Sequence, residues 1–161
     1  MTAIKLDGAY LGNGECSTRV TWDGGDFSTA DYESIDASDK VTKQKVPGQG
    51  RYAVGRTSGY YEADDAKIGM YLDKFCELQL ALSTKAKAEN KHLTDVVFNI
   101  RCSWASGDIV HTLLLESCQL IGRSLGTKSG DPKAEVLQWP VSVMKLYLDN
   151  VCLVDDTGVT Q

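Results

Sequence analysis

The stretch that decides the fold is Val96-Val97-Phe98-Asn99-Ile100-Arg101-Cys102-Ser103-Trp104. Every second position, from Val96 to Trp104, is apolar, and the positions between are mostly polar. A period of two residues is that of a β-strand, whose side chains point alternately to its two faces. The stretch therefore predicts a strand with one buried face.

Two more long strands are expected after it. Ser106-Gly107-Asp108 predicts a turn, and residues 109–121 then form a strand with Leu113 and Leu115 on one face and Leu114 on the other. Residues 134–148 are predicted to form another long strand, after a polar loop tip at 126–132. Apolar residues on both faces indicate strands that are covered on both sides, or covered only after assembly.

The first half of the chain is less regular. Residues 17–22 predict a strand that ends at the turn Asp23-Gly24-Gly25. Residues 26–45 are polar and predict an irregular or partly extended segment. Residues 46–59 carry four glycines and predict a strand and turns.

One helix is expected, at residues 65–84. Apolar residues recur there at steps of three and four, which places them on one helical face. Asp64 or Asp65 would cap its start, because a short carboxylate accepts from the free N–H groups of the first turn. Gly69 lowers helix propensity by about 1 kcal/mol relative to alanine, so the first turn is expected to fray.

Length and composition indicate a single domain covering residues 1–161. The chain is 42% hydrophobic and 24% charged, and its fifteen glycines and three prolines favour a β-rich fold with many turns. A formal charge of −5 argues against tight nucleic-acid binding. The sequence shows no signal peptide and no apolar stretch of about 20 residues, so we expect a protein that begins in a cytoplasm and has no membrane anchor.

No catalytic, cofactor-binding or metal-binding residues are predicted. His92 and His111 are the only histidines, and neither is accompanied by a nucleophile or a metal-ligand spacing. The glycines at 48, 50 and 55 do not have the spacing of a dinucleotide loop, and Lys128-Ser129 lacks the preceding glycine of a phosphate loop. Five widely spaced cysteines predict reduced thiols that serve as small apolar fillers. The chain is therefore predicted not to be an enzyme.

The charges are distributed unevenly. Residues 15–39 hold seven acids and one base, a net −6, whereas residues 40–59 hold five bases and no acid, a net +5. In a monomer, the two blocks would be solvated surface. In a polymer, the basic block of one subunit would meet an acidic surface of another.

Several segments resemble phage tail tube proteins. They are the glycine-marked run PGQGRYAVGRTSGYYE (47–62), TDVVFNI (94–100), HTLLLESCQL (111–120), the polar tip at 126–132 and VSVMKLY (141–147). The order of strand, polar loop, glycine segment, helix and long hairpin is also similar over residues 15–154. The resemblance implies a mainly β, α+β fold: an antiparallel β-sandwich or partial barrel with one flanking helix.

The resemblance also implies a structural role in the virion. Six subunits would join their long strands into a ring whose inner wall is a continuous β-barrel, and stacked hexamers would form a tube that conducts DNA, without specific binding, during genome ejection. Assembly would take place in the cytoplasm of the host bacterium, with sheath, baseplate and tail-terminator proteins as further partners.

Three alternatives stay open at this point. The tube proteins of type VI secretion and of contractile injection machines are similar in architecture. A small-ligand-binding cytoplasmic β-barrel would need a concave apolar pocket with a few convergent polar groups. An enzyme of unrecognised type is disfavoured by the absence of a motif.

Overall fold

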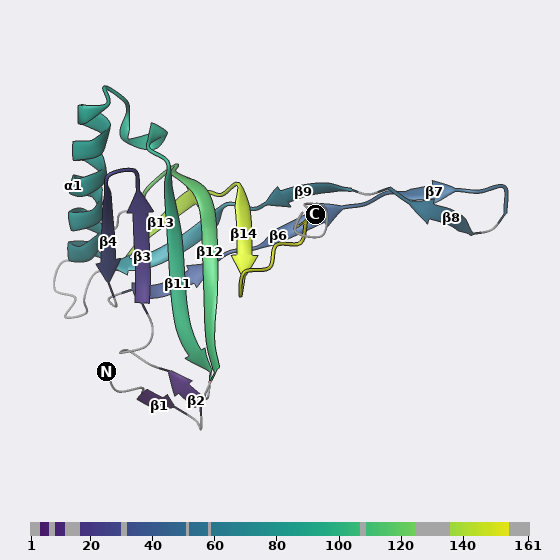
Figure 1. Ribbon diagram of the computed structural model, residues 1–161, viewed down its shortest axis with the longest axis horizontal. Helices are drawn as coiled ribbons and strands as arrows, with labels where there is room; N and C mark the ends of the chain where they lie inside the picture. Colours follow the sequence, from purple (N-terminus) through teal and green to yellow (C-terminus); the bar gives the residue numbers. More distant parts are fainter. Residues whose placement is uncertain are drawn as a thin grey trace.

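The computed structural model describes residues 4–6, 9–11, 17–29, 32–50, 52–57, 59–106, 109–124 and 136–154. Its largest unit is one antiparallel sheet of eight strands (Figure 1). These strands are β3 (Ser17–Trp22), β4 (Gly25–Thr29), β5 (Tyr32–Asp36), β10 (Ala66–Tyr71), β11 (Phe98–Ser106), β12 (Ile109–Leu120), β13 (Val136–Ser142) and β14 (Lys145–Leu148). Their order across the sheet is β4-β3-β11-β12-β13-β10-β5, and β14 also pairs with β12.

The sheet turns on itself at β12. The middle of β12 pairs with β14, where Leu115 faces Leu146, and its end pairs with β13, where Leu120 faces Val141. Among the described strands, β4 and β5 end the path without pairing with each other, so the barrel of the single chain is open. The predicted antiparallel partial barrel with a flanking helix is confirmed.

The core fills the space inside this bend. Trp139 is 1% exposed, and its ring centroid lies 5.4 Å from that of Phe75 and 6.4 Å from that of Phe98. The predicted alternation on β11 is confirmed, because Phe98, Ile100 and Cys102 are buried. Packing between rings from β11, β13 and the helix joins both halves of the sheet into one hydrophobic cluster.

The helix α1 spans Leu72–Ala88, so the predicted start at residue 65 is wrong. Residues 66–71 form β10 instead, and Ala66, Ile68 and Met70 are buried on it. Apolar residues at 66 and 70 fit the helical spacing of four residues as well as the strand spacing of two. Residues 66–71 form a strand because they pair with β5 and β13. Asp64 does not cap the helix; its carboxylate accepts from Ser38 Oγ at 2.9 Å.

The predicted long strand at 134–148 is two strands. Val143 is buried and Met144 is exposed at the bend between β13 and β14, and Met144 N donates to Glu116 O at 3.2 Å. The break lets this run of chain pair with both the middle and the end of β12. The predicted loop tip at 126–132 and the turn residues Gly107 and Asp108 lie outside the described residues.

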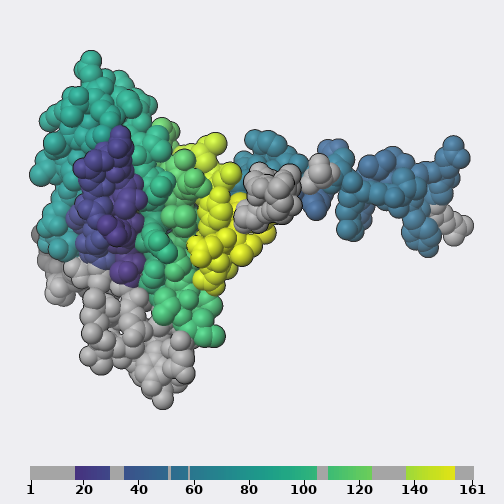
Figure 2. Space-filling view, in the orientation of Figure 1, coloured from purple at the N-terminus to yellow at the C-terminus, as the bar shows by residue number. Residues whose placement is uncertain are grey.

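A long two-stranded ribbon, here called the arm (residues 39–63), leaves the body on the side opposite α1 (Figures 1 and 2). Its strands are β6 (Asp39–Thr42), β7 (Lys45–Pro47), β8 (Ala53–Arg56) and β9 (Tyr60–Ala63). The pairs β6–β9 and β7–β8 are joined where Thr57 N donates to Gln44 O at 2.8 Å. The segment at 26–45, predicted to be irregular or partly extended, is extended over most of its length, since it holds most of β4, all of β5 and β6, and the start of β7.

Three short elements complete the described chain. β1 (Ile4–Leu6) and β2 (Ala9–Leu11) form a separate antiparallel pair, and η1 (Leu93–Asp95) is a 3-10 turn between α1 and β11. Of the helices that the structure describes, neither combines the length and the apolar character needed to traverse a lipid bilayer.

A candidate subunit interface on the projecting arm

The outer half of the arm is exposed on both faces. Tyr52 is 84% exposed and Val54 is 74% exposed, and every described residue of β7 and β8 is exposed. A two-stranded ribbon in water is marginally stable, because it has no second layer on which to bury its side chains. The arm therefore presents apolar groups that the described part of the chain does not cover.

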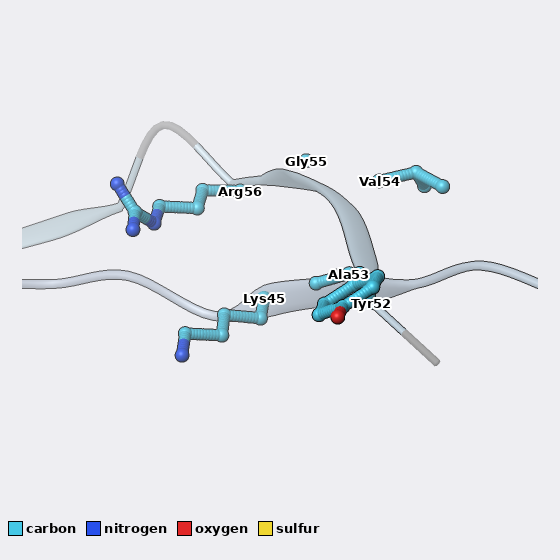
Figure 3. Close-up of a pocket in the computed structure, with 6 residues that line it drawn as sticks. All are labelled: Lys45, Tyr52, Ala53, Val54, Gly55 and Arg56. Atoms are coloured by element: carbon cyan, nitrogen blue, oxygen red, sulfur yellow. The ribbon is translucent and has the colours of Figure 1, made fainter. Parts of the chain in front are cut away.

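Its basic side chains are also uncompensated. Lys45 lies directly opposite Arg56, and like charges in that position destabilise a strand pair. Figure 3 shows these two side chains extending in the same direction while Val54 points away from them. Within the described residues, Lys43, Lys45 and Arg56 form no ion pair. An anionic surface docked here would remove the repulsion.

The basic residues at 40–59 do not form one uniform block in the structure. Lys40 Nζ lies 3.4 Å from Asp64 Oδ1 and 3.9 Å from Glu62 Oε2, and both acids lie just beyond the basic run. The free positive charge is thus confined to the outer half of the arm. Over residues 39–63, five bases face two acids, a net +3, so the rest of the −5 chain carries −8.

The acidic block is likewise divided. Asp26 is paired with Arg19 at 2.6 Å, and Asp39 accepts a hydrogen bond from Tyr61 at 2.9 Å. Asp23 is exposed on the body, where its Oδ2 lies 4.0 Å from Lys85 Nζ, and Asp36 is exposed without a described ion pair. Glu15 and Asp31 lie outside the described residues. The acids that remain open to a partner are therefore on the body and not on the arm.

A shallow hollow of about 560 Å³ lies on the arm, lined by Lys45, Tyr52, Ala53, Val54, Gly55 and Arg56 (Figure 3). Its lining combines two cations, an aromatic ring and aliphatic groups. Lys45 and Arg56 supply positive charge and hydrogen-bond donors, and Tyr52 supplies an aromatic ring, so the lining is suited to binding an anionic group. An acidic segment with apolar side chains would match it.

A second uncovered area follows the sheet edge at β14. Met144 is 66% exposed, Leu148 is 48% exposed, and Val151 and Leu153 beyond the strand are exposed as well. This area was not predicted from the sequence, because residues 134–148 were expected to form one strand. The alternation of apolar residues that breaks at Val143-Met144 was the available signal.

The outward face of the sheet is mainly polar. Arg101 on β11 lies opposite Arg19 on β3 and Leu114 on β12. Leu115 is buried, Leu113 packs against the core and Leu114 lies on the other face, so the predicted faces of β12 are confirmed. Leu114 is half-buried among these polar neighbours.

The two histidines lie apart from the arm hollow. His111 Nδ1 is 2.8 Å from Asp149 Oδ2, and its ring is 5.9 Å from that of Trp104. The hydrogen bond from His111 and a second from Thr112 N hold the pKa of the Asp149 carboxyl below its ordinary value. His92 is exposed and precedes η1. In the described residues, no three potential ligands gather around a metal position.

The cysteines fit their predicted role in part. Cys102, Cys118 and Cys152 are buried, whereas Cys76 is exposed on α1 and Cys16 lies outside the described residues. Burial raises the pKa of the Cys118 thiol to about 12, so it stays protonated and unreactive.

No protein-family model matches the chain, and no curated protein matches it. Solved structures do share its fold. A chain from the cryo-EM structure of the anti-feeding prophage baseplate, 6-fold symmetrised, has a TM-score of 0.59 at 8% identity, over 92% of this chain and 97% of that one.

Two further solved structures extend the comparison. A chain of the cap that terminates the anti-feeding prophage tube has a TM-score of 0.55 at 11% identity, over 83% of this chain and 88% of that one. Hcp1 from Flavobacterium johnsoniae has a TM-score of 0.51 at 12% identity, over 86% of this chain and 98% of that one. The chain therefore has the fold of these chains, which confirms, for the fold, the resemblance to tube proteins of phages and contractile injection machines.

Proposed function

We propose that the chain is a structural, non-enzymatic subunit of a tube, in a phage tail or in a related contractile injection machine. The observation that carries the proposal is the arm, whose apolar and basic side chains are left uncovered by the described part of the chain. A shared fold with a 6-fold symmetrised baseplate chain and with a chain of a tube-terminating cap supports it.

The partner that the arm fits best is a second copy of the chain. The arm is net positive and the remainder is strongly negative, so copies attract each other through unlike surfaces. Such a contact joins two different patches, and contacts of this kind generate closed rings or continuous stacks. Asp36, exposed on the body without a described ion pair, is the acid of the predicted acidic block that a basic arm would meet most readily.

Ring formation would also cover the open edges of the sheet. In the described chain, β4 pairs only with β3 and β5 pairs only with β10, so each has one unpaired side. Unpaired edges invite pairing with another chain, and closure into a ring removes them. Six copies would complete the barrel, and the mainly polar face around Arg101 and Leu114 would line its lumen.

We expect the inner wall to be acidic or neutral overall, because six copies of a −5 subunit would surround the lumen. DNA would pass during ejection without specific binding, because tight phosphate contacts through counterion release would stall it. A phage role places the subunit in the virion tail after assembly in the bacterial cytoplasm, with sheath, baseplate and terminator proteins as partners. A contractile injection machine would use the same tube for its own cargo.

The ligand-binding barrel is the less favoured function. The space inside the bent sheet is filled by Trp139, Phe98 and Ile68, all among the largest fully buried side chains. A binding barrel needs that space as an apolar cavity with convergent polar groups.

Negative-stain electron microscopy of the purified protein, combined with size-exclusion chromatography, tests the proposal. We expect rings or tubes at low salt. A compact monomer that stays monomeric at high concentration would contradict the tube function and return attention to small ligands.

A further inference from the structure

The hydroxyl of Tyr61 lies where the arm meets the body. Tyr61, on β9, donates to Asp39 Oδ2 on β6 at 2.9 Å. The same oxygen accepts from the backbone N–H of Leu146, on β14, at 3.0 Å. One atom thus connects both strands of the arm to an edge strand of the sheet, and β9 lies against β14.

The surroundings make this junction stronger than a surface contact. Leu146 is 8% exposed, and Cys152 beside the hydroxyl is buried. Burial raises the pKa of Tyr61, so the hydroxyl keeps the proton that it donates to the carboxylate. A hydrogen bond to an ionised group is about twice as strong as a neutral one. The bond from Leu146 also satisfies an amide that β12 does not use.

Other polar contacts at the root have a different effect. Ser38 Oγ donates to Asp64 Oδ2 at 2.9 Å, and Lys40 lies near Glu62 and Asp64. These contacts join the two sides of the arm to each other. The Tyr61–Leu146 bond, in contrast, joins the arm to β14.

We propose that Tyr61 is a positioning residue that fixes the direction of the arm relative to the sheet edge, so that the arm reaches a neighbouring copy already oriented. This inference rests on the proposed tube function. About nine residues separate Tyr61 from the tip, or about 30 Å of strand. A rotation of about 15° at the root would therefore move the tip by about 8 Å at that length. Orienting the arm in advance reduces the entropy lost on docking.

The test compares Tyr61→Phe with Tyr60→Phe. Both changes remove one hydroxyl from adjacent residues of β9, but Tyr60 is exposed and makes no described hydrogen bond through its side chain. Hydrogen exchange of the Leu146 amide measures the bond itself. Spin labels on Cys76 of α1 and on an introduced Val54→Cys, in a Cys16→Ser background, measure the spread of arm directions in the monomer.

For Tyr61→Phe we expect Leu146 to lose protection by roughly threefold to tenfold, the factor that one hydrogen bond contributes. The distance distribution should broaden, and the concentration needed for tubes should rise by a similar factor. Tyr60→Phe should match the wild type in the two monomer measurements, the Leu146 exchange and the distance distribution. Unchanged Leu146 exchange and an unchanged distribution in Tyr61→Phe would overturn the proposal, as would equal effects from Tyr60→Phe.

A second variant guards against a general loss of structure. If Tyr61→Phe also speeds hydrogen exchange of the amides of β11 and β12, the variant Asp39→Asn replaces it as the test of the junction. The substituted side chain still offers Tyr61 an acceptor, but without the negative charge the hydrogen bond is weaker. We expect Asp39→Asn to broaden the arm distribution by less than Tyr61→Phe; no broadening would overturn the proposal. The two monomer measurements do not need a tube, so they can support the junction even if wild-type protein never polymerises, an outcome that contradicts the tube function alone.

Discussion

The body and the arm differ in what covers their apolar side chains. In the body, residues such as Ile68 and Trp139 alternate with polar ones and are almost completely buried within the subunit. In the arm, Tyr52, Val54 and Tyr60 have similar apolar character but stay largely exposed. The packing of the body explains why its apolar residues are there. The arm's residues are explained only by a surface that the described chain does not provide, which is why we assign the arm to assembly.

The largest expected effect comes from a large-to-small change on each side of this comparison. Trp139→Ala should lower the free energy of unfolding by about 3–5 kcal/mol, because it leaves a cavity between Phe75 and Phe98. Tyr52→Ala should cost less than about 0.5 kcal/mol in the monomer, since its ring is exposed. Urea unfolding followed by circular dichroism measures both. Similar costs would contradict the division into a packed body and an uncovered arm.

The next effect separates the two faces of β12. Leu114→Lys should leave a soluble, folded subunit but raise the concentration needed for polymerisation by about tenfold or more, because a charge would enter the proposed lumen and interface face. Leu113→Lys is the matched control: its side chain packs against the core, so it should destabilise the monomer itself. Tubes of normal dimensions from Leu114→Lys would show that this face is not part of the assembly.

A smaller effect is expected from charge reversal on the arm. Lys43→Glu with Lys45→Glu should raise the polymerisation concentration by a few-fold, since exposed ion pairs contribute about 0.2–1 kcal/mol each. Added salt should have the same effect on the wild type, because it screens exposed charges. Lys87→Glu, an equal change of sign per residue on α1, serves as the control. If neither added salt nor the Lys43→Glu, Lys45→Glu double substitution changes the polymerisation concentration, the basic residues of the arm are solvated surface.

The smallest effect concerns pH and the pair His111–Asp149. The pKa of Asp149 is held below its ordinary value of 3.8 by hydrogen bonds from His111 and Thr112 N. A lowered pKa in the folded state stabilises the protein above the ordinary value, and this stabilisation is lost as the pH falls through the folded-state pKa. The wild type should therefore exceed Asp149→Asn in melting temperature near pH 5, with the gap closing as the pH falls below 3.8. A constant gap would contradict the assignment.

Some elements were predictable because one local pattern sufficed. Residues 96–104 alternate strictly on one face, so β11 was expected within two residues at each end. The start of α1 could not be predicted, because the spacing of Ala66 and Met70 fits both a helix and a strand. Only the pairing of β10 with β5 and β13 shows that these residues form a strand. The split of 134–148 also depends on partners, since both halves pair with β12.

The candidate interface was predictable in its charge but not in its shape. The basic run at 40–59 was evident from composition, whereas residues 26–45 were expected only to be irregular or partly extended. The strand β7 is exposed throughout, so its sequence lacks the alternation that burial imposes. Tyr61 could not be found either. Its contact with Leu146 spans 85 residues and involves a backbone amide, so no local sequence pattern marks it.

The most direct test of the arm's role is its removal. Thr42 and Tyr60 are paired in the β6–β9 ribbon, so an Asn-Gly turn can replace residues 43–59 without disturbing the root. Electron microscopy and size-exclusion chromatography of this variant should show folded monomers with the thermal stability of the wild type and no tubes. Tubes of wild-type dimensions from the armless subunit would contradict the claim that the arm is an assembly element.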